Sequence, residues 1–209
     1  MTLGFIGIGK VGFALANGLQ NKGHSIIIGN DDPSSKSVKS ALESNESFRT
    51  MSIGDMLTEV NMVFLATPFS AVEDIVSKIG LENMILVDCT NPVGPNISHG
   101  LESKISGSEK IQEWAPGVHV VKAFTIYGFE NFQNPVYPKY PMEPVMLMAG
   151  NDPESKKRVA ALVMDLGFEA KDVGPLDQAL HLEHMTLLWV KMVRRDGHHP
   201  NFVWALLER

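Results

Sequence analysis

The 209-residue chain contains a single cysteine, Cys89, and fewer basic than acidic residues. A disulfide framework needs paired cysteines and a cysteine-built zinc site needs several, so the composition excludes both. The 18 lysine and arginine residues and the 24 aspartate and glutamate residues give a net charge of −6. Binding to the phosphates of nucleic acid needs a basic surface, so nucleic acid is excluded as the main partner.

Long hydrophobic runs are also absent. No apolar run approaches the roughly 18 residues that suggest a membrane-spanning helix. The N-terminal segment is apolar, but it lacks the basic region and the cleavage site of a signal peptide. We therefore expect no membrane partner and a cytoplasmic location. The hydrophobic content of 44% and a mean hydropathy near zero are typical of a folded globular protein.

Short apolar runs alternate with segments of helical periodicity along the chain. The expected strands cover residues 3–8, 24–28, 48–51, 61–66, 84–87, 118–124, 145–148 and 168–173. The expected helices run from the first glycine-rich turn to Gly23, from a turn at residues 31–34 to about Ser44, and over residues 52–59, 69–79, 107–114, 153–166 and 176–194. This alternation predicts an α/β fold with a doubly wound, mainly parallel sheet of the Rossmann type and a C-terminal strand–helix extension.

A complete G-x-G-x-x-G sequence, Gly7-Ile8-Gly9-Lys10-Val11-Gly12, lies between the first expected strand and the first helix. Gly7 allows the tight turn, Gly9 lets a pyrophosphate approach the backbone, and Gly12 lets the helix and strand pack closely. The helix N-terminus offers free N–H groups and a favourable dipole to phosphates. A tight turn without a ligand is the alternative, but the strand–turn–helix context favours dinucleotide binding.

Four prolines, at positions 135, 138, 141 and 144, mark residues 134–144 as a linker or lid. We expect residues 1–133 to form the dinucleotide-binding core. Residues 134–209 would be a proline-rich connection and a C-terminal strand–helix extension of the same compact unit.

The end of the second strand decides which nucleotide binds. An NAD site carries an acidic residue about 20 positions beyond the glycines, and Asn30, Asp31 and Asp32 occupy that place. Asp31 or Asp32 would repel a 2′-phosphate, whereas Lys36 would attract one. Alternatively, both aspartates cap the next helix. These residues therefore do not decide between NAD and NADP as the nucleotide.

Six segments together resemble a known family. In order they are Gly4 to Gly12, Phe64-Leu65-Ala66-Thr67-Pro68, Val87-Asp88-Cys89-Thr90-Asn91-Pro92, Val121-Lys122-Ala123-Phe124, Ala149-Gly150-Asn151-Asp152 and Asp165-Leu166-Gly167-Phe168. The set resembles the NADP oxidoreductases that reduce the deazaflavin coenzyme F420. It is also similar to the cytoplasmic domain of six-transmembrane ferric reductases.

The resemblance implies a nicotinamide lying across the carboxyl ends of the strands, with hydride passing to a stacked flavin or deazaflavin. It places Thr67 and Pro68 between adenosine and nicotinamide, Thr90, Asn91 and Pro92 at the nicotinamide, and Ala123, Phe124 and Thr125 on the far side. Independently, these loops follow strands at the edge where open α/β sheets bind ligands. The chain departs from the family twice: Asn30-Asp31 replaces the Ser-Arg pair that holds the 2′-phosphate, and Thr125-Ile126 replaces Asn-Thr.

Three further side chains could carry chemistry. His181 and His184 lie three residues apart on the last helix, where they could bind a metal or an acceptor. No third ligand has a recognisable spacing, so we expect surface or interface histidines and no metal. Cys89 follows a strand near the expected nicotinamide, but a small buried hydrophobe is the favoured role. The broad apolar face of the last helix indicates core or a homodimer interface.

The sequence therefore predicts an NAD(P)H-dependent oxidoreductase that passes hydride to a small-molecule flavin- or deazaflavin-like acceptor. Such transfer needs orientation and stacking more than an acid or base, so no catalytic side chain is assigned. A non-catalytic dinucleotide sensor is one alternative. A small hydroxyacid or imine dehydrogenase is another, but it needs a helical domain with a catalytic lysine and an asparagine four residues later; Lys191 is followed there by Arg195.

Overall fold

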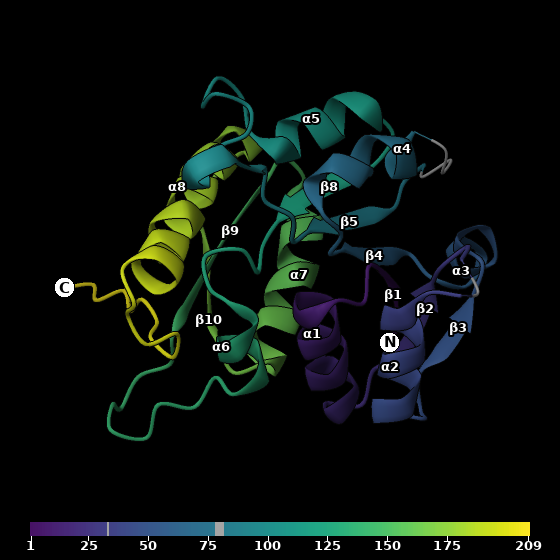
Figure 1. Cartoon of the computed structure of the whole chain (residues 1–209), viewed down its shortest axis with the longest axis horizontal. Helices are drawn as coiled ribbons and strands as arrows, with labels where there is room; N and C mark the ends of the chain where they lie inside the picture. Colours follow the sequence, from purple (N-terminus) through teal and green to yellow (C-terminus); the bar gives the residue numbers. More distant parts are fainter. Residues whose placement is uncertain (33, 78–81) are drawn as a thin grey trace.

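The computed structural model describes residues 1–32, 34–77 and 82–209. In this part of the chain, eight strands form one sheet in the order β10-β9-β8-β5-β4-β1-β2-β3 (Figure 1). The strands are β1 (Thr2–Ile6), β2 (Ser25–Gly29), β3 (Arg49–Met51), β4 (Met62–Leu65), β5 (Ile85–Asp88), β8 (His119–Lys122), β9 (Val145–Gly150) and β10 (Glu169–Asp172). The first six run parallel, β9 pairs antiparallel with β8, and β10 runs parallel to β9.

Helices cover both faces of this sheet, which is why its central strands are continuous apolar runs. One face packs against α1 (Lys10–Asn21), α2 (Lys36–Ser44), α6 (Phe129–Gln133), α7 (Pro153–Asp165) and α8 (Ala179–Val190). The other packs against α3 (Ile53–Glu59), α4 (Val72–Val76) and α5 (Gly107–Trp114). Alternate residues of β4 show the principle, because Phe64 joins the first core and Val63 the second.

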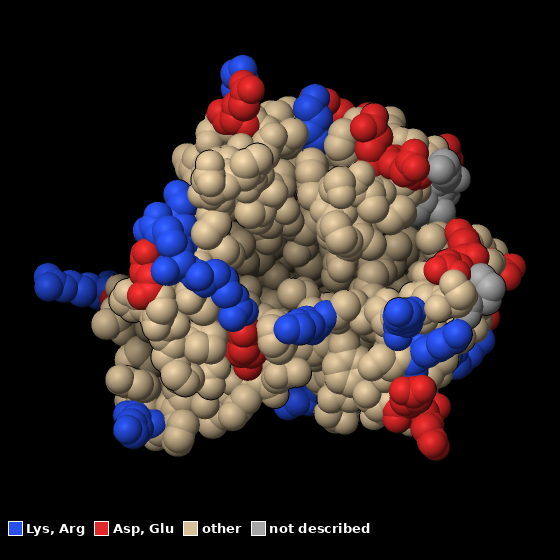
Figure 2. Space-filling model, viewed as in Figure 1, with Lys and Arg blue, Asp and Glu red and all other residues tan. Residues whose placement is uncertain are grey.

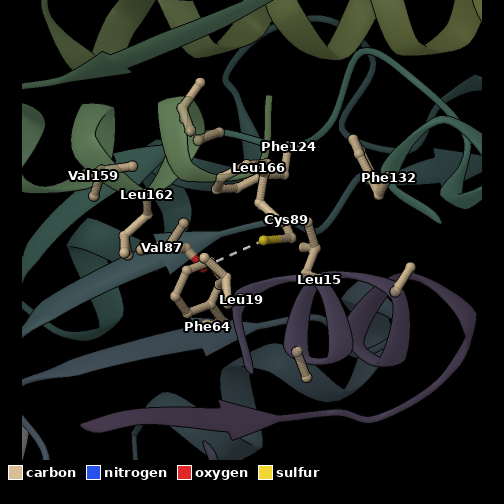
Figure 3. Close-up of a cluster of buried hydrophobic side chains, with 14 of the residues drawn as sticks. Leu15, Leu19, Phe64, Val87, Cys89, Phe124, Phe132, Val159, Leu162 and Leu166 are labelled. Carbon is tan, nitrogen blue, oxygen red and sulfur yellow. Dashed lines mark hydrogen bonds between the residues drawn. The ribbon is translucent and has the colours of Figure 1, made fainter. Parts of the chain in front are cut away.

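Figure 3 shows the first core in detail. Leu15 and Leu19 of α1 lie beside Phe64 of the sheet, and Leu162 of α7 lies above Val87. Cys89 lies among these side chains, and its thiol donates to the carbonyl of Val87 at 3.8 Å. Burial raises the pKa of this thiol well above its ordinary value. Cys89 therefore has the environment of a small buried hydrophobe.

The strand pairing brings several loops to one edge. Ile6 lies opposite Leu65, Leu65 opposite Asp88, and Asp88 opposite Lys122. The residues that follow these strands therefore meet at the carboxyl edge of the sheet. Strand β1 lies between β2 and β4, so the strand order reverses there, which is where open α/β sheets bind ligands.

The sequence predicts the eight strands to within two residues at each end. The helix expected at 69–79 is instead a 3-10 turn, η1 (Phe69–Ala71), followed by α4, and its last residues lie outside the described part of the chain. The helix expected at 176–194 is divided into η3 (Leu176–Gln178), α8 and a π turn, η4 (Lys191–Arg195). Helix α6 and the small hairpin of β6 (Val93–Gly94) and β7 (Ser98–His99) are not predicted.

The C-terminal tail after η4 has no regular secondary structure, but hydrogen bonds hold it against the start of β9. The carbonyl of Trp204 accepts a hydrogen bond from the amide of Val145 at 3.0 Å. The Tyr127 hydroxyl donates to the carbonyl of Val145 at 2.6 Å and accepts from the amide of Trp204 at 3.0 Å. No helix in the described residues is long and apolar enough to cross a membrane.

Candidate functional site

The three glycines of the first loop have different roles. Gly7 has φ +93°, and a Cβ there would lie 2.6 Å from the Ala66 carbonyl oxygen. A Cβ at Gly12 would lie 2.1 Å from the Gly7 oxygen. A Cβ at Gly9 would meet nothing within 4 Å. Gly7 and Gly12 are therefore needed by the protein itself, whereas Gly9 keeps an open space beside the loop.

That open space lies at the N-terminus of α1. Gly9 is the N-cap, so no side chain satisfies the first N–H groups, and the first turn contains no acidic residue. Free N–H groups and the helix dipole together favour a phosphate at this point. Ile8 is buried beside the loop, and Lys10 and Val11 form the first turn of the helix.

A cavity of about 280 Å³ opens beside the glycine loop, between α1, α2 and α6. Its polar lining includes Lys10, Ser37, Ser40 and Gln133. The Lys10 ammonium lies 5.1 Å from the centre of the Phe129 ring, a cation–π arrangement. The cavity thus offers a cation, hydroxyls and an amide next to the expected pyrophosphate position.

The residues after β2 do not cap the next helix. The Asp31 carboxylate accepts a hydrogen bond at 2.9 Å from the amide of Ile53, the first residue of α3, whose N-cap is Ser52. Asp32 accepts from the hydroxyl and the amide of Ser34, and these bonds lower the pKa of Asp32. Asn30 donates to the carbonyl of Asp32. Lys36 is exposed at the start of α2 and is not part of the cavity lining.

A second cavity, of about 380 Å³, joins the loops after β4 and β5. Pro68, Asn91 and Pro92 line it together, as the resemblance implies, and Gly100 and Leu101 complete the opposite wall. Figure 2 shows a broad hollow in this face of the molecule, above α1 and beside α8. Lys and Arg side chains lie along its lower edge, whereas its walls are formed by uncharged residues (Figure 2).

Three residues predicted to bind the cofactor have buried polar atoms without a hydrogen-bond partner among the described residues. They are Thr67 Oγ1, Asn91 Oδ1 and Thr125 Oγ1. Buried polar atoms normally have partners, because leaving them unpaired costs free energy. All three belong to loops at the carboxyl edge of the sheet.

The other predicted residues of these loops face the protein. Thr90 donates through its amide and its hydroxyl to Asp88, at 2.8 and 2.7 Å. Ala123 is fully buried, and the Phe124 ring packs 5.9 Å from the ring of Phe64 in the core. Phe124 has φ +55°, an uncommon conformation for a residue other than glycine. The loop after β8 is therefore held in a fixed, turned conformation.

Sequence reasoning missed a buried charged network behind these loops. The Lys122 ammonium lies 3.0 Å from both the Asp88 and the Glu183 carboxylates, and it donates to the carbonyl of Thr90 at 2.6 Å. Burial disfavours the charge on Lys122, but the two carboxylates outweigh burial and raise its pKa. Asp88 also accepts from the Ser108 hydroxyl at 2.6 Å. The sequence feature that could have indicated this network is the charged residue at the end of each apolar strand, Asp88 in β5 and Lys122 in β8.

Both histidines of α8, His181 and His184, are exposed, as expected for surface histidines. His184 shares a hydrogen bond of 2.9 Å with the Ser103 hydroxyl, and its ring lies 5.5 Å from that of His99. Burial, followed by the nearby His99 and His181, lowers the pKa of His184. Glu183, between the two histidines in sequence, points into the network instead. Among the described residues, no group of three or more candidate ligands could hold a metal.

Comparisons with known proteins agree with the resemblance. Residues 2–92 match the model of the family described as NADP oxidoreductase coenzyme F420-dependent. No curated protein matches the chain at a significant level.

Several solved structures have a similar fold. One is a candidate F420-dependent NADP-reductase from Arthrobacter sp. FB24, with a TM-score of 0.85, 23% identity and all of both chains covered. A hypothetical protein from Sinorhizobium meliloti has a TM-score of 0.76 and 27% identity, with 86% of this chain and 88% of that one covered.

A reductive aminase from Aspergillus terreus, solved with NADPH and ethyl-5-oxohexanoate, has a TM-score of 0.68 and 15% identity. The match covers 92% of this chain and 61% of the aminase. The neighbours confirm the Rossmann-type α/β fold, and the family match confirms the resemblance for residues 2–92.

Proposed function

We propose that the protein is an NADPH-dependent oxidoreductase that passes hydride to a flavin- or deazaflavin-like acceptor. The observation that carries the proposal is the set of open features along one sheet edge. The space at Gly9 and the uncapped start of α1 suit a pyrophosphate. The unpartnered atoms of Thr67, Asn91 and Thr125 suit the rest of a dinucleotide. The family match and the aminase neighbour support NADP as the nucleotide.

In this proposal the residues of the chain bind and orient NADPH, and none of them takes part in the chemical step. The glycine loop binds the pyrophosphate, and Asn91 holds the nicotinamide end against the loops after β5 and β8. NADPH, when bound, supplies the hydride. The uncharged walls of the hollow exclude water from the transferred hydride and offer a planar acceptor a surface for stacking. No side-chain acid or base is required for the transfer itself.

The choice of NADPH over NADH rests on local charge. Asp31 is engaged with the amide of Ile53, so its carboxylate neutralises the N-terminus of α3. Lys10 supplies a cation beside the cavity that contains Ser37 and Ser40. We propose that this cavity accommodates the 2′-phosphate in place of the Ser-Arg pair of the family.

The proposal is tested by mixing the protein with NADPH or NADH and a panel of acceptors: FMN, a 5-deazaflavin, a ferric chelate and a cyclic imine. We expect oxidation of NADPH with the flavin or the deazaflavin. Nucleotide binding without oxidation by any acceptor would favour a dinucleotide sensor. Oxidation with the imine alone would favour the dehydrogenase alternative.

We further propose a homodimer of single compact units in the cytoplasm, with residues 134–209 packed on the core of residues 1–133. Leu188 of α8 is half exposed, which supports a subunit contact on that helix. Light scattering of Leu188→Glu beside the unmodified protein measures the mass in solution. A monomeric mass for the unmodified protein would contradict the dimer.

A further inference from the structure

Glu183 is a buried carboxylate in the middle of α8. Its side chain is 1% exposed. A buried carboxylate is costly unless several partners surround it. Glu183 has three: the Lys122 ammonium at 3.0 Å, the His99 ring at 2.7 Å and the amide of Gly107 at 2.9 Å. Each partner belongs to a different element, so Glu183 joins parts of the chain that are far apart in sequence.

The Lys122 side of the network holds one wall of the 380 Å³ cavity. Lys122 donates to the carbonyl of Thr90, and Asp88 accepts from the amide and the hydroxyl of the same residue. The loop after β5 is therefore fixed from both sides just before Asn91. Asn91 and Pro92 line the cavity directly.

The His99 side holds the opposite wall. His99 accepts hydrogen bonds at Nδ1 from the amides of Leu101 and Ser103, each at 3.2 Å. Because Nδ1 accepts, the proton is on Nε2, which donates to Glu183. The loop that supplies Gly100 and Leu101 to the cavity is thus tied to Glu183 through one neutral imidazole.

We propose that Glu183 is a positioning residue for the nicotinamide end of the site. It does not touch the cofactor; it sets the distance between the Asn91 loop and the Leu101 loop, through Lys122 on one side and His99 on the other. This inference rests on the proposed function, because it assumes that the nicotinamide enters this cavity. The adenosine and pyrophosphate end depends on the glycine loop and is independent of Glu183.

The test compares two probes in calorimetric titrations: NADPH, and 2′-phospho-ADP-ribose, which lacks the nicotinamide. Glu183→Gln keeps the size of the side chain but removes its charge. We expect the Kd of the fragment to change less than about twofold and the Kd of NADPH to rise about tenfold, which corresponds to about 1.4 kcal/mol. A merely structural role would weaken both probes equally or neither.

A second variant, His99→Asn, tests the same proposal if Glu183→Gln does not fold. In His99→Asn the amide oxygen can still accept from the Leu101 and Ser103 amides, but the side chain is too short to reach Glu183. It should show the same selective loss of NADPH affinity. Lys156→Met is the matched control, because it removes an ion pair of 2.8 Å with Asp172 at a distant edge of the sheet. It should leave both Kd values unchanged.

The outcomes separate the two claims. An unmodified protein that binds neither probe contradicts the proposed function, and the positioning role with it. An unmodified protein that binds both probes, with variants whose two Kd values rise in parallel, overturns the positioning role alone. Unchanged affinities in folded variants overturn it equally.

Discussion

Single atoms decide what the glycine loop can tolerate. At Gly7 and Gly12 a methyl group would collide with backbone atoms at 2.6 and 2.1 Å, so these positions serve the turn itself. At Gly9 the protein offers free space, and only a ligand would compete for it. The same motif therefore contains two glycines that the turn itself requires and one, Gly9, for which we propose a role in binding.

Gly9→Ala should leave the fold intact and weaken NADPH binding at least tenfold, because the new methyl group would occupy the position of the pyrophosphate. Thermal unfolding and a fluorescence titration measure the two effects. Gly54→Ala is the matched control, because a Cβ there also meets nothing within 4 Å and Gly54 lies in α3, away from the loop. Unchanged NADPH affinity in Gly9→Ala would contradict the assignment of the loop.

Three buried groups predict how stability responds to alkali. Burial raises the pKa of the Cys89 thiol well above its ordinary value of 9.0 and the pKa of Tyr127 above its ordinary value of 10.0, and the carboxylates around Lys122 outweigh burial and raise the pKa of that lysine. All three groups keep their proton in the folded protein after the unfolded chain has lost it. Their contribution is therefore full below about pH 9 and falls above it, by about 1.4 kcal/mol per pH unit for each group once the pH exceeds the pKa of that group in the unfolded chain.

Chemical denaturation between pH 8 and pH 11 measures this slope. Tyr127→Phe should reduce the slope by the contribution of one titrating group, about 1.4 kcal/mol per pH unit. The variant also loses the hydrogen bond to the carbonyl of Val145. Tyr140→Phe, at an exposed tyrosine, should keep the full slope. A stability that stays constant through this range would show that none of the three pKa values is raised as described.

Some secondary-structure elements can be predicted from the sequence more reliably than others. The strands are predicted because each is a short apolar run between turn residues. The helix expected over residues 52–59 is found as α3, where the Ser52 hydroxyl accepts from the amide of Asp55 as the N-cap. Helix α6 is only five residues long, and the hairpin of β6 and β7 has two residues in each strand. Elements this short have no measurable period, so their contacts can only be seen in three dimensions.

The C-terminal tail behaves as an element despite its irregular backbone. The ring of Phe202 lies 6.0 Å from that of Trp189 and 5.8 Å from that of Trp204. Deleting residues 201–209 should therefore cost about 3 kcal/mol or more, as expected for loss of packed aromatic side chains.

Deleting only residues 206–209 is the matched control for the tail. Leu207 is largely exposed, and the Lys171–Glu208 pair lies at the surface, so this shorter deletion should cost less than about 1 kcal/mol. Thermal and denaturant unfolding of both deletions measure the difference. Equal losses would mean that the aromatic contacts do not hold the tail.

At the scale of the whole molecule, the site is the edge where separate loops meet. The glycine loop could be located from sequence because its residues are adjacent and its spacing is diagnostic. The charged network behind the cavity walls could not be located from sequence. Its members become neighbours only through the strand order and the packing of α8; they are Asp88, His99, Lys122 and Glu183. Asp31 shows the same limit: its partner, Ile53, lies 22 residues away.

The nucleotide preference is a property of this assembled edge. Lys10→Met should weaken NADPH binding more than NADH binding, by about fivefold or more in the ratio of the two Kd values, because it removes the cation proposed for the 2′-phosphate. Lys22→Met, at the far end of α1, should leave the ratio unchanged. Parallel loss of both affinities would place Lys10 at the pyrophosphate instead.

Deuterium labelling of NADPH distinguishes direct hydride transfer from reduction that proceeds by way of water. NADPH labelled at either face of carbon 4 is mixed with the protein and a 5-deazaflavin, whose reduced carbon 5 does not exchange its hydrogen with water. We expect one of the two labelled forms to deliver deuterium to that carbon. Bound NADPH that reduces no deazaflavin, or a reduced product carrying hydrogen from water, would contradict direct hydride transfer.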